Sequence, residues 1–168
     1  GLTAAGLDVN PTATAFYKSN NSYKRSGRGS SAKINDAPIA DIKANADLLS
    51  SLQTYGDAAI FTLSRPGGGE GSDFSSTGTD GENGNYLRLN QNEKDCLKLL
   101  KSYKDQGKIK KIIILLNTSN QPECDFLDNS EYGIDSALWI GNTGISGLAA
   151  VGKILVGDIN PSGHLSDT

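Results

Sequence analysis

The sequence predicts an α/β fold: an open, mainly parallel sheet with helices on both faces, a three-layer α/β/α sandwich. Three continuously apolar runs, 57–64, 111–117 and 134–141, are typical of buried neighbouring parallel strands. Segments with helical spacing separate these runs, and that alternation calls for crossover connections and a parallel sheet. With 168 residues the chain is expected to form a single domain over residues 1–168.

The N-terminal third begins with a short predicted helix. Asn10 and Pro11 are suited to be its N-cap and first helical residue, and we expect it to end near Tyr17. Residues 19–33 are polar and rich in Gly and Ser, which indicates a long loop. Apolar residues at helical spacing then predict one helix over 37–55, which ends before the strand at Gly56.

A further helix is predicted from residue 90 onward. Asn90 is the expected N-cap, and Glu93 completes a capping box three residues later. Gly107 is a natural end for this helix. An apolar stripe at helical spacing supports the assignment and consists of Cys96, Leu99, Leu100 and Tyr103.

The C-terminal part alternates in the same way. A short helix is expected to start near Ser119 with Pro122 in its first turn, and a last helix is expected over 144–156. Trp139 could stack on a sugar ring, but its place inside an apolar run favours packing in the core.

Charge and composition exclude several classes of function. A net charge of −3 and a pI near 5.1 argue against a nucleic-acid partner and an anionic membrane. Two basic clusters, 24–28 and 108–111, carry no interleaved aromatic residues. No apolar run approaches membrane-spanning length. The absence of Met suggests a piece of something longer.

The sequence offers neither a metal site nor a cofactor motif. Cys96 and Cys124 lack redox or zinc spacing, and we expect two partly buried free thiols. His164 is the only histidine, and no nucleophile elbow precedes it to build a catalytic triad. We therefore expect no metal and no cofactor.

The glycine-rich segment 66–85 is the strongest candidate for chemistry. It follows the apolar run 57–64, and ligands of open α/β sheets bind at loops that leave the carboxyl ends of strands. Glu70 and Asp73 place two carboxylates among glycines, and Arg65 stands directly at the strand end. The alternatives are a flexible surface loop with solvated acids and, for Arg65, a surface salt bridge of little energetic value.

A non-catalytic ligand-binding or interaction module of doubly wound form is the other class considered. The glycine segment lacks both the P-loop pattern and a well-formed dinucleotide fingerprint. A receiver domain would need an acidic pair after its first strand and a lysine after a later one, and neither is present.

A series of motifs in chain order resembles the α/β sandwich domain of glycoside hydrolase family 3. The Gly-Glu-Gly-x-Asp and Gly-Asp-x-Asn-Pro-Ser-Gly elements are the most specific of them, and the resemblance runs from about Leu2 to the C-terminus. The motifs are Tyr55-Gly-Asp-Ala-Ala-Ile60, Ser64-Arg65, Gly69-Glu-Gly-Ser-Asp73, Leu89-Asn-Gln-Asn-Glu-Lys-Asp95, Ile114-Leu-Leu-Asn-Thr-Ser119, Ala137-Leu-Trp-Ile-Gly141 and Gly157-Asp-Ile-Asn-Pro-Ser-Gly163.

The resemblance implies one half of the active site of a retaining β-glycosidase of the β-glucosidase or β-xylosidase type. Glu70 matches the general acid/base, and Asp73 matches the second acid of the motif, which would hold the loop. Arg65 would order Glu70 or touch the substrate. The nucleophile would come from a separate (β/α)8 barrel domain of the same parent chain, and the substrate would be an oligosaccharide or other glycoside. The isolated domain would be inactive, with residues 66–85 mobile in the absence of the barrel.

Two details of the motif bear on this interpretation. The family usually has Arg after the motif aspartate, whereas here Phe74 follows, which leaves a non-catalytic sugar-binding domain as an alternative. Ser72-Asp73-Phe74 superficially resembles the Ser-Asp-Trp motif of the family's nucleophile. It follows a polar glycine segment rather than an apolar strand, so we reject that assignment.

Overall fold

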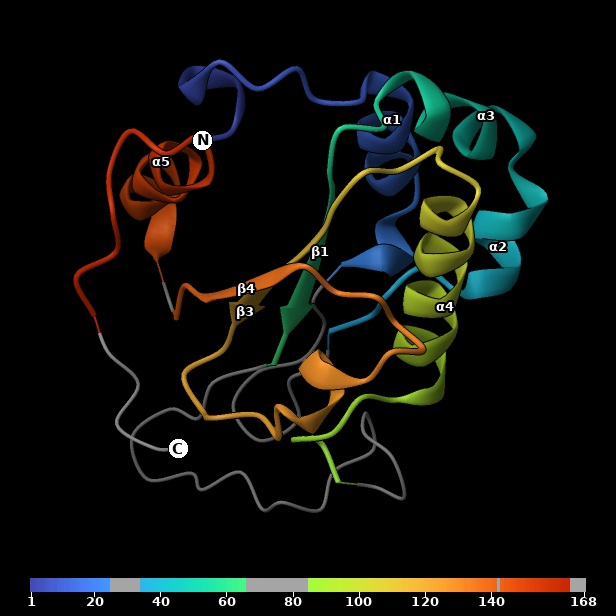
Figure 1. Cartoon of the computed structure of the whole chain (residues 1–168). Helices are drawn as coiled ribbons and strands as arrows, with labels where there is room; N and C mark the ends of the chain where they lie inside the picture. The colour runs from blue at the N-terminus through green and yellow to red at the C-terminus, as the bar shows by residue number, and fades with distance from the viewer. Residues whose placement is uncertain (25–33, 66–84, 142, 164–168) are drawn as a thin grey trace. The chain divides into compact units, whose positions relative to one another are not determined.

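The computed structural model describes residues 1–24, 34–65, 85–141 and 143–163 (Figure 1). Contacts divide the chain into a sheet unit, Asn10–Asn142, and a terminal unit, Gly1–Val9 with Thr143–Thr168. The elements are η1 (Thr3–Ala5), α1 (Pro11–Ser19), η2 (Asn21–Tyr23), α2 (Ile39–Ala44), α3 (Ala46–Thr54), β1 (Ala59–Ser64), α4 (Gln91–Asp105), β3 (Ile112–Asn117), η4 (Asp125–Asp128), β4 (Ser136–Trp139) and α5 (Gly144–Leu155).

The described strands form one parallel sheet in the order β1-β3-β4. Ala59 pairs with Ile112 at the start of β1, and Ser64 pairs with Asn117 at its end. On the other side of β3, Ile113 pairs with Ser136 of β4. The α/β class and the parallel arrangement of the three apolar runs are therefore confirmed. The carboxyl ends of the strands meet at one edge of the sheet.

One face of β3 forms the centre of the core. Ile112, Ile114 and Leu116 point to this face and are almost fully buried. They pack with Leu97 of α4 and Phe126 of η4 in a single apolar cluster. α4 therefore covers this face of the sheet.

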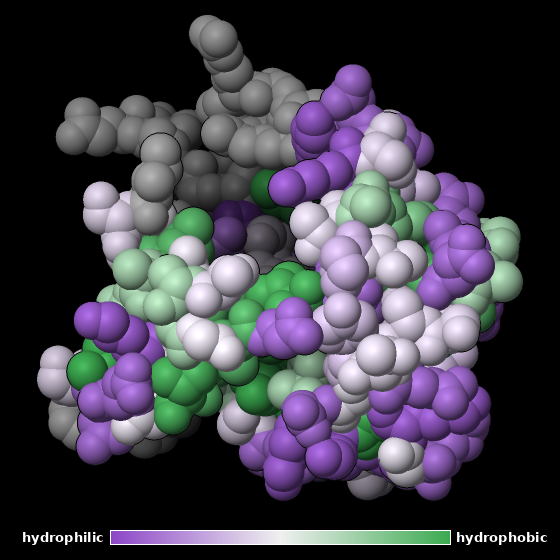
Figure 2. Space-filling model, turned by 90° about the horizontal axis from the view of Figure 1, so that it is seen from above, coloured by the Kyte–Doolittle hydropathy of each residue, from purple (hydrophilic) through white to green (hydrophobic). Residues whose placement is uncertain are grey.

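A second, smaller cluster lies on the other side of α4. Ile42 of α2 and Leu48 of α3 are buried there, and Cys96 and Leu99 of α4 pack against them. Figure 1 shows α2 and α3 beyond α4 as seen from the sheet. The side of these outer helices visible in Figure 2 is mainly hydrophilic or neutral. α4 is therefore packed on two sides, while α2 and α3 are amphipathic.

The predicted helix over 37–55 is wrong as a single helix, because the chain breaks at Asn45. This residue has φ −94° and ψ 92°, ends α2, and is the N-cap of α3. Its side-chain oxygen accepts a hydrogen bond from the Leu48 N–H at 2.9 Å. Asn side chains compete with the helical backbone for its hydrogen bonds, which explains the break.

The predicted helix near Ser119 is also wrong. The described helical turn in this region is η4, a 3-10 helix that starts at Asp125 and leaves Pro122 outside. Before it, the Thr118 hydroxyl donates to the Asn120 carbonyl at 2.8 Å and accepts from the Asn120 N–H at 3.1 Å. These local bonds hold the chain in a turn, where a helix would need the same backbone groups.

Other local predictions are confirmed. The Asn10 side chain caps α1 by accepting from the Thr12 and Ala13 N–H groups. The capping box of α4 is present, and Gly107 follows that helix with φ +72°. The last helix, α5, forms close to its predicted place and contacts η1 within the terminal unit.

Candidate functional site

The carboxyl edge of the sheet carries a chain of polar contacts between strand ends. Asn117, the last residue of β3, donates from its side chain to the Ser64 hydroxyl of β1 at 3.2 Å. The Arg65 N–H continues the ladder to the Asn117 carbonyl at 3.2 Å. On the other side, the Trp139 indole donates to the carbonyl of Thr118 at 2.8 Å. This edge is thus held by side chains as well as by the sheet ladder.

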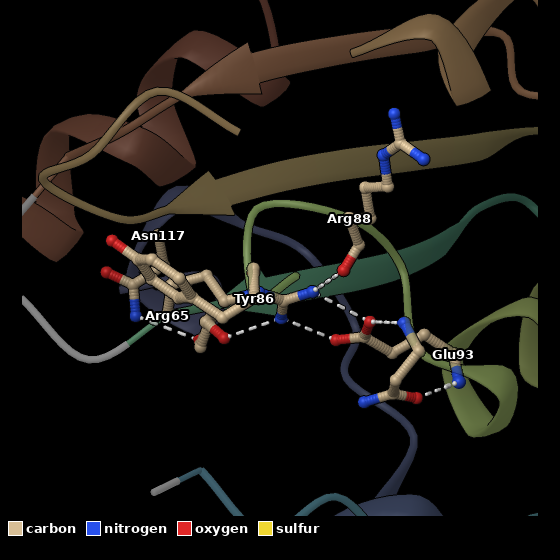
Figure 3. A network of polar contacts seen from close by, with 7 residues as sticks. Arg65, Tyr86, Arg88, Glu93 and Asn117 are labelled. Atoms are coloured by element: carbon tan, nitrogen blue, oxygen red, sulfur yellow. Dashed lines mark hydrogen bonds and ion pairs between the residues drawn. The ribbon is translucent and has the colours of Figure 1, made fainter. Parts of the chain in front are cut away.

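Arg65 is the centre of a buried network at this edge (Figure 3). The residue is 5% exposed, although its side chain carries a full charge. Its guanidinium donates five hydrogen bonds. Two go to the carboxylate of Glu93, at 2.6 and 2.8 Å, and three go to backbone carbonyls. The carbonyls belong to Ser64, Tyr86 and Arg88. The side chain is therefore no surface salt bridge.

Glu93 lies at the third position of α4 and has two roles there. One carboxylate oxygen accepts from the Asn90 N–H at 2.8 Å, which closes the capping box. The same carboxylate forms the two-pronged pair with Arg65, and Glu93 is only 2% exposed. The start of α4 is thereby joined to the end of β1 through a charge-assisted pair.

Residues 85–88, at the end of the glycine-rich segment and directly after it, are held from a second direction. Glu123, which lies after β3, accepts from the Asn85 side chain at 3.0 Å and from Arg88 Nε at 2.6 Å. The Glu123 N–H donates to the Leu87 carbonyl at 3.0 Å. The Tyr86 hydroxyl contacts the side-chain amide of Asn120. Residues 85–88 are therefore tied both to Arg65 and to the chain that leaves β3.

Among the predicted site residues, the structure places Arg65 at the carboxyl edge of the sheet. Glu70, Asp73 and Phe74 belong to residues 66–84, which lie outside the described residues. The expectation of mobility for residues 66–85 therefore falls, except for Asn85, outside the described residues as well. The two described ends of the segment, Arg65 and residues 85–88, are brought together by the network in Figure 3.

Sequence reasoning identified Glu93 only as part of a capping box and of the family motif over residues 89–95, and it did not identify Tyr86 or Glu123. Glu93 and Arg65 are 28 residues apart, so no local periodicity links them. The signals for Glu93 were the capping box, which accounts for one hydrogen bond of its carboxylate, and its place in the family motif over residues 89–95. Tyr86 joins the network through its backbone carbonyl, and Glu123 joins it through the side chains of Asn85 and Arg88, contacts that a residue pattern does not encode.

The described residues offer little else for chemistry. Both cysteines are free, as predicted, and both are partly buried. Burial, with the nearby Asp36 carboxylate, raises the pKa of Cys96 to about 11, and burial also raises the pKa of Cys124. Both are therefore thiols at neutral pH. Within the described ranges there is no cluster of three or more residues suited to hold a metal ion, and no helix there is long and apolar enough to cross a membrane.

Comparison with known proteins identifies the family. Residues 9–168 match the family described as "Glycosyl hydrolase family 3 C-terminal domain". The chain belongs to this family. The parallel sheet and the helix packed on it agree with that membership.

Two relatives of this family 3 domain carry the name of an enzyme. The chain is 26% identical to "Beta-glucosidase" of Ruminococcus albus, a match that covers 96% of this chain and 20% of the relative. It is 30% identical to "Beta-glucosidase A" of Butyrivibrio fibrisolvens, over 73% of this chain and 16% of the relative. The matched part is thus a fifth or less of each relative. No solved structure matches the chain.

Proposed function

We propose that this family 3 domain supplies the general acid/base, Glu70, to the active site of a retaining β-glycosidase. The observation that carries the proposal is the family match over residues 9–168, combined with a Gly-Glu-Gly-x-Asp motif shortly after the carboxyl end of β1. That end of a parallel strand is where ligands of open α/β sheets bind. The substrate class proposed is a β-glucoside, in keeping with the names of both relatives.

The chemistry needs a second carboxylate. In a retaining mechanism a nucleophile attacks the anomeric carbon while the acid protonates the leaving oxygen, and the two carboxyl groups stand about 5 Å apart. We assign to Glu70 the protonation of the leaving oxygen and, after the covalent intermediate has formed, the deprotonation of water. The nucleophile comes from a (β/α)8 barrel domain of the same parent chain in this proposal. The relatives are several times longer than this chain, which leaves room for such a domain.

Arg65 and Asp73 have supporting roles in the proposal. All five hydrogen bonds of the Arg65 guanidinium go to groups of this chain, an arrangement that favours ordering of the chain over contact with substrate. Asp73, three residues after Glu70, is assigned to hold the segment by accepting backbone hydrogen bonds.

The test uses the complete enzyme that contains this chain and compares Glu70→Ala with Glu82→Ala. Glu82 is a matched control because it lies in the same glycine-rich segment outside the motif. Glu70→Ala should slow hydrolysis of an unactivated disaccharide by about 10²–10⁴-fold, the usual contribution of a positioned proton donor. A dinitrophenyl glucoside, whose leaving group needs no protonation, should react with much less loss in the glycosylation step.

Azide provides an independent readout. It needs no base to attack the glycosyl-enzyme intermediate, so it should restore turnover of the activated substrate by Glu70→Ala and yield a glycosyl azide of retained configuration. The isolated 168-residue chain should hydrolyse neither substrate. Wild-type kcat/KM of Glu70→Ala on the disaccharide would exclude this residue as the acid.

A non-catalytic sugar-binding domain is the second candidate, and one observation favours it. Phe74 stands where the family usually has Arg after the motif aspartate. This candidate predicts that the complete protein binds a glucoside without hydrolysing it, which equilibrium binding and product analysis on the same sample separate directly.

A further inference from the structure

The buried pair of Arg65 and Glu93 does more than capping requires. A capping box needs one carboxylate oxygen, and the Glu93 carboxylate accepts one hydrogen bond from the Asn90 N–H. The carboxylate nevertheless also binds both terminal nitrogens of Arg65, at 2.6 and 2.8 Å. Side chains of the two residues are 3% and 2% exposed. The Arg65 guanidinium therefore lies in the interior, paired with a carboxylate whose capping role needs only one of its oxygens.

Stability alone does not account for a buried ion pair. The desolvation penalty of two charges offsets much of their attraction, and apolar replacements of similar volume are often equally stable or more so. What a two-pronged pair provides is a fixed plane and direction for the guanidinium. A guanidinium fixed in this way can hold other groups of the chain in place.

The guanidinium holds the chain on both sides of residues 66–84. Its remaining hydrogen bonds go to the carbonyl of Ser64, before the segment, and to the carbonyls of Tyr86 and Arg88, after it. All three carbonyls thus accept from one side chain, and Figure 3 shows the contact of this side chain with Arg88. Glu93, fixed to the start of α4, therefore sets through Arg65 where the two ends of the segment stand relative to each other and to the helix.

We propose that Glu93 is a positioning residue for acid/base catalysis: through Arg65 it sets the placement of both ends of the segment that carries Glu70. This inference rests on the proposed function. Misplacing a reacting group by about 1 Å can cost on the order of 100-fold in rate, so loss of the pair acts on the proton-transfer step. Glu93 itself touches neither substrate nor reacting atoms.

The test compares Glu93→Gln with Glu131→Gln in the complete enzyme. Gln has nearly the same shape as Glu and can still accept from Asn90 and from one nitrogen of Arg65, but it removes the charge. Glu131 is a matched control, because it pairs with Lys98 of the same helix at 3.0 Å while both side chains are exposed. The measurement is kcat and KM for β-glucosides whose leaving groups span a wide range of pKa, with thermal melting as a check of folding.

We expect Glu93→Gln to lower kcat/KM for the poorest leaving groups by about 10–100-fold and for dinitrophenol by less than about threefold. Glu131→Gln should match wild type throughout. A merely structural role would not produce a loss that depends on the leaving group. An equal loss for every leaving group, or no loss in a folded variant, would overturn the inference.

Glu70→Ala, measured in the same series, separates the two proposals. If Glu70→Ala shows no dependence on the leaving group, the proposed function fails and this inference with it. If Glu70→Ala shows that dependence and Glu93→Gln does not, only the present inference fails. Arg65→Lys is the second variant, since Lys keeps the positive charge but lacks the planar guanidinium that binds both carboxylate oxygens. It should reproduce the loss of kcat/KM that is largest for poor leaving groups. If neither Glu93→Gln nor Arg65→Lys folds, the pair is a requirement of folding and the inference is overturned.

Discussion

Asp135 and Ile112 are joined by two hydrogen bonds, and each residue donates one of them. The Asp135 N–H donates to the Ile112 carbonyl at 2.9 Å, and the Ile112 N–H donates to the Asp135 carboxylate at 2.8 Å. Ile112 is the first residue of β3, and Asp135 stands directly before β4. Lys104 also donates to this carboxylate, at 2.6 Å. One carboxylate thus aligns the start of two neighbouring strands.

The pH dependence of stability should reveal this contact. Partial burial raises the pKa of Asp135, but hydrogen bonds from Lys104, the Ile112 N–H and Lys111 outweigh it and bring the pKa to about 2, against 3.8 ordinarily. The stabilisation is therefore complete above 3.8 and disappears as pH falls toward about 2. Urea unfolding should find Asp135→Asn less stable than wild type at neutral pH, with the difference shrinking over that acidic range. A constant difference would contradict this prediction.

Gly56 should not tolerate a side chain. A Cβ built on it would stand 2.1 Å from the Lys108 carbonyl oxygen, and the Gly56 carbonyl itself accepts from the Lys110 N–H at 2.8 Å. Because the obstacle is backbone, Gly56→Ala should lower the free energy of unfolding by about 1–3 kcal/mol. Gly163→Ala is the control: among the described residues, apart from its chain neighbours, no atom lies within 4 Å of a Cβ built on Gly163, and the effect should stay within about 0.5 kcal/mol.

Trp139→Phe should destabilise the carboxyl edge of the sheet through a lost donor. The indole N–H satisfies the carbonyl of Thr118, a residue with no exposed surface. Phe leaves that buried carbonyl without this bond, at a cost of about 1–3 kcal/mol in addition to lost packing. Trp139 is the single tryptophan, so circular dichroism rather than fluorescence should follow the unfolding. An unchanged unfolding midpoint would refute the importance of this hydrogen bond.

Asn45→Ala should cost about 1 kcal/mol by removing the cap of α3. Asn45→Ser is the matched comparison, since a hydroxyl can accept from the Leu48 N–H in place of the amide oxygen. The Ser variant should unfold close to wild type in a urea titration. Equal destabilisation by Ala and Ser would mean that Asn45 acts through something other than capping.

The strands could be predicted because their burial leaves a direct trace in composition. Ile112 to Leu116 are apolar without interruption, as a central parallel strand requires, and the pairing on both sides follows. The break at Asn45 could not be predicted in the same way. Apolar spacing continues across it, and only the direction taken by one amide side chain separates two helices from one.

The residues of the candidate site could likewise be predicted only in part. Arg65 could be singled out as a candidate for loop ordering or substrate binding, since it stands between a strand and the glycine-rich segment. Its partner could not, because the link to Glu93 crosses 28 residues and depends on how α4 packs against the sheet. A local motif such as a capping box identifies one hydrogen bond of a carboxylate and says nothing about the others.

The pairing of β1 with β3 also shapes how the domain folds. Ser64 and Asn117, whose side chains meet at the end of both strands, are 53 residues apart. The chain between them must close into a loop before any hydrogen bond between β1 and β3 can form. Helix α4, with its own capping box, can instead begin to form from local contacts. Refolding should therefore be limited by closure of this long connection. Because closure entropy grows only with the logarithm of length, shortening residues 66–84 should change the folding rate modestly.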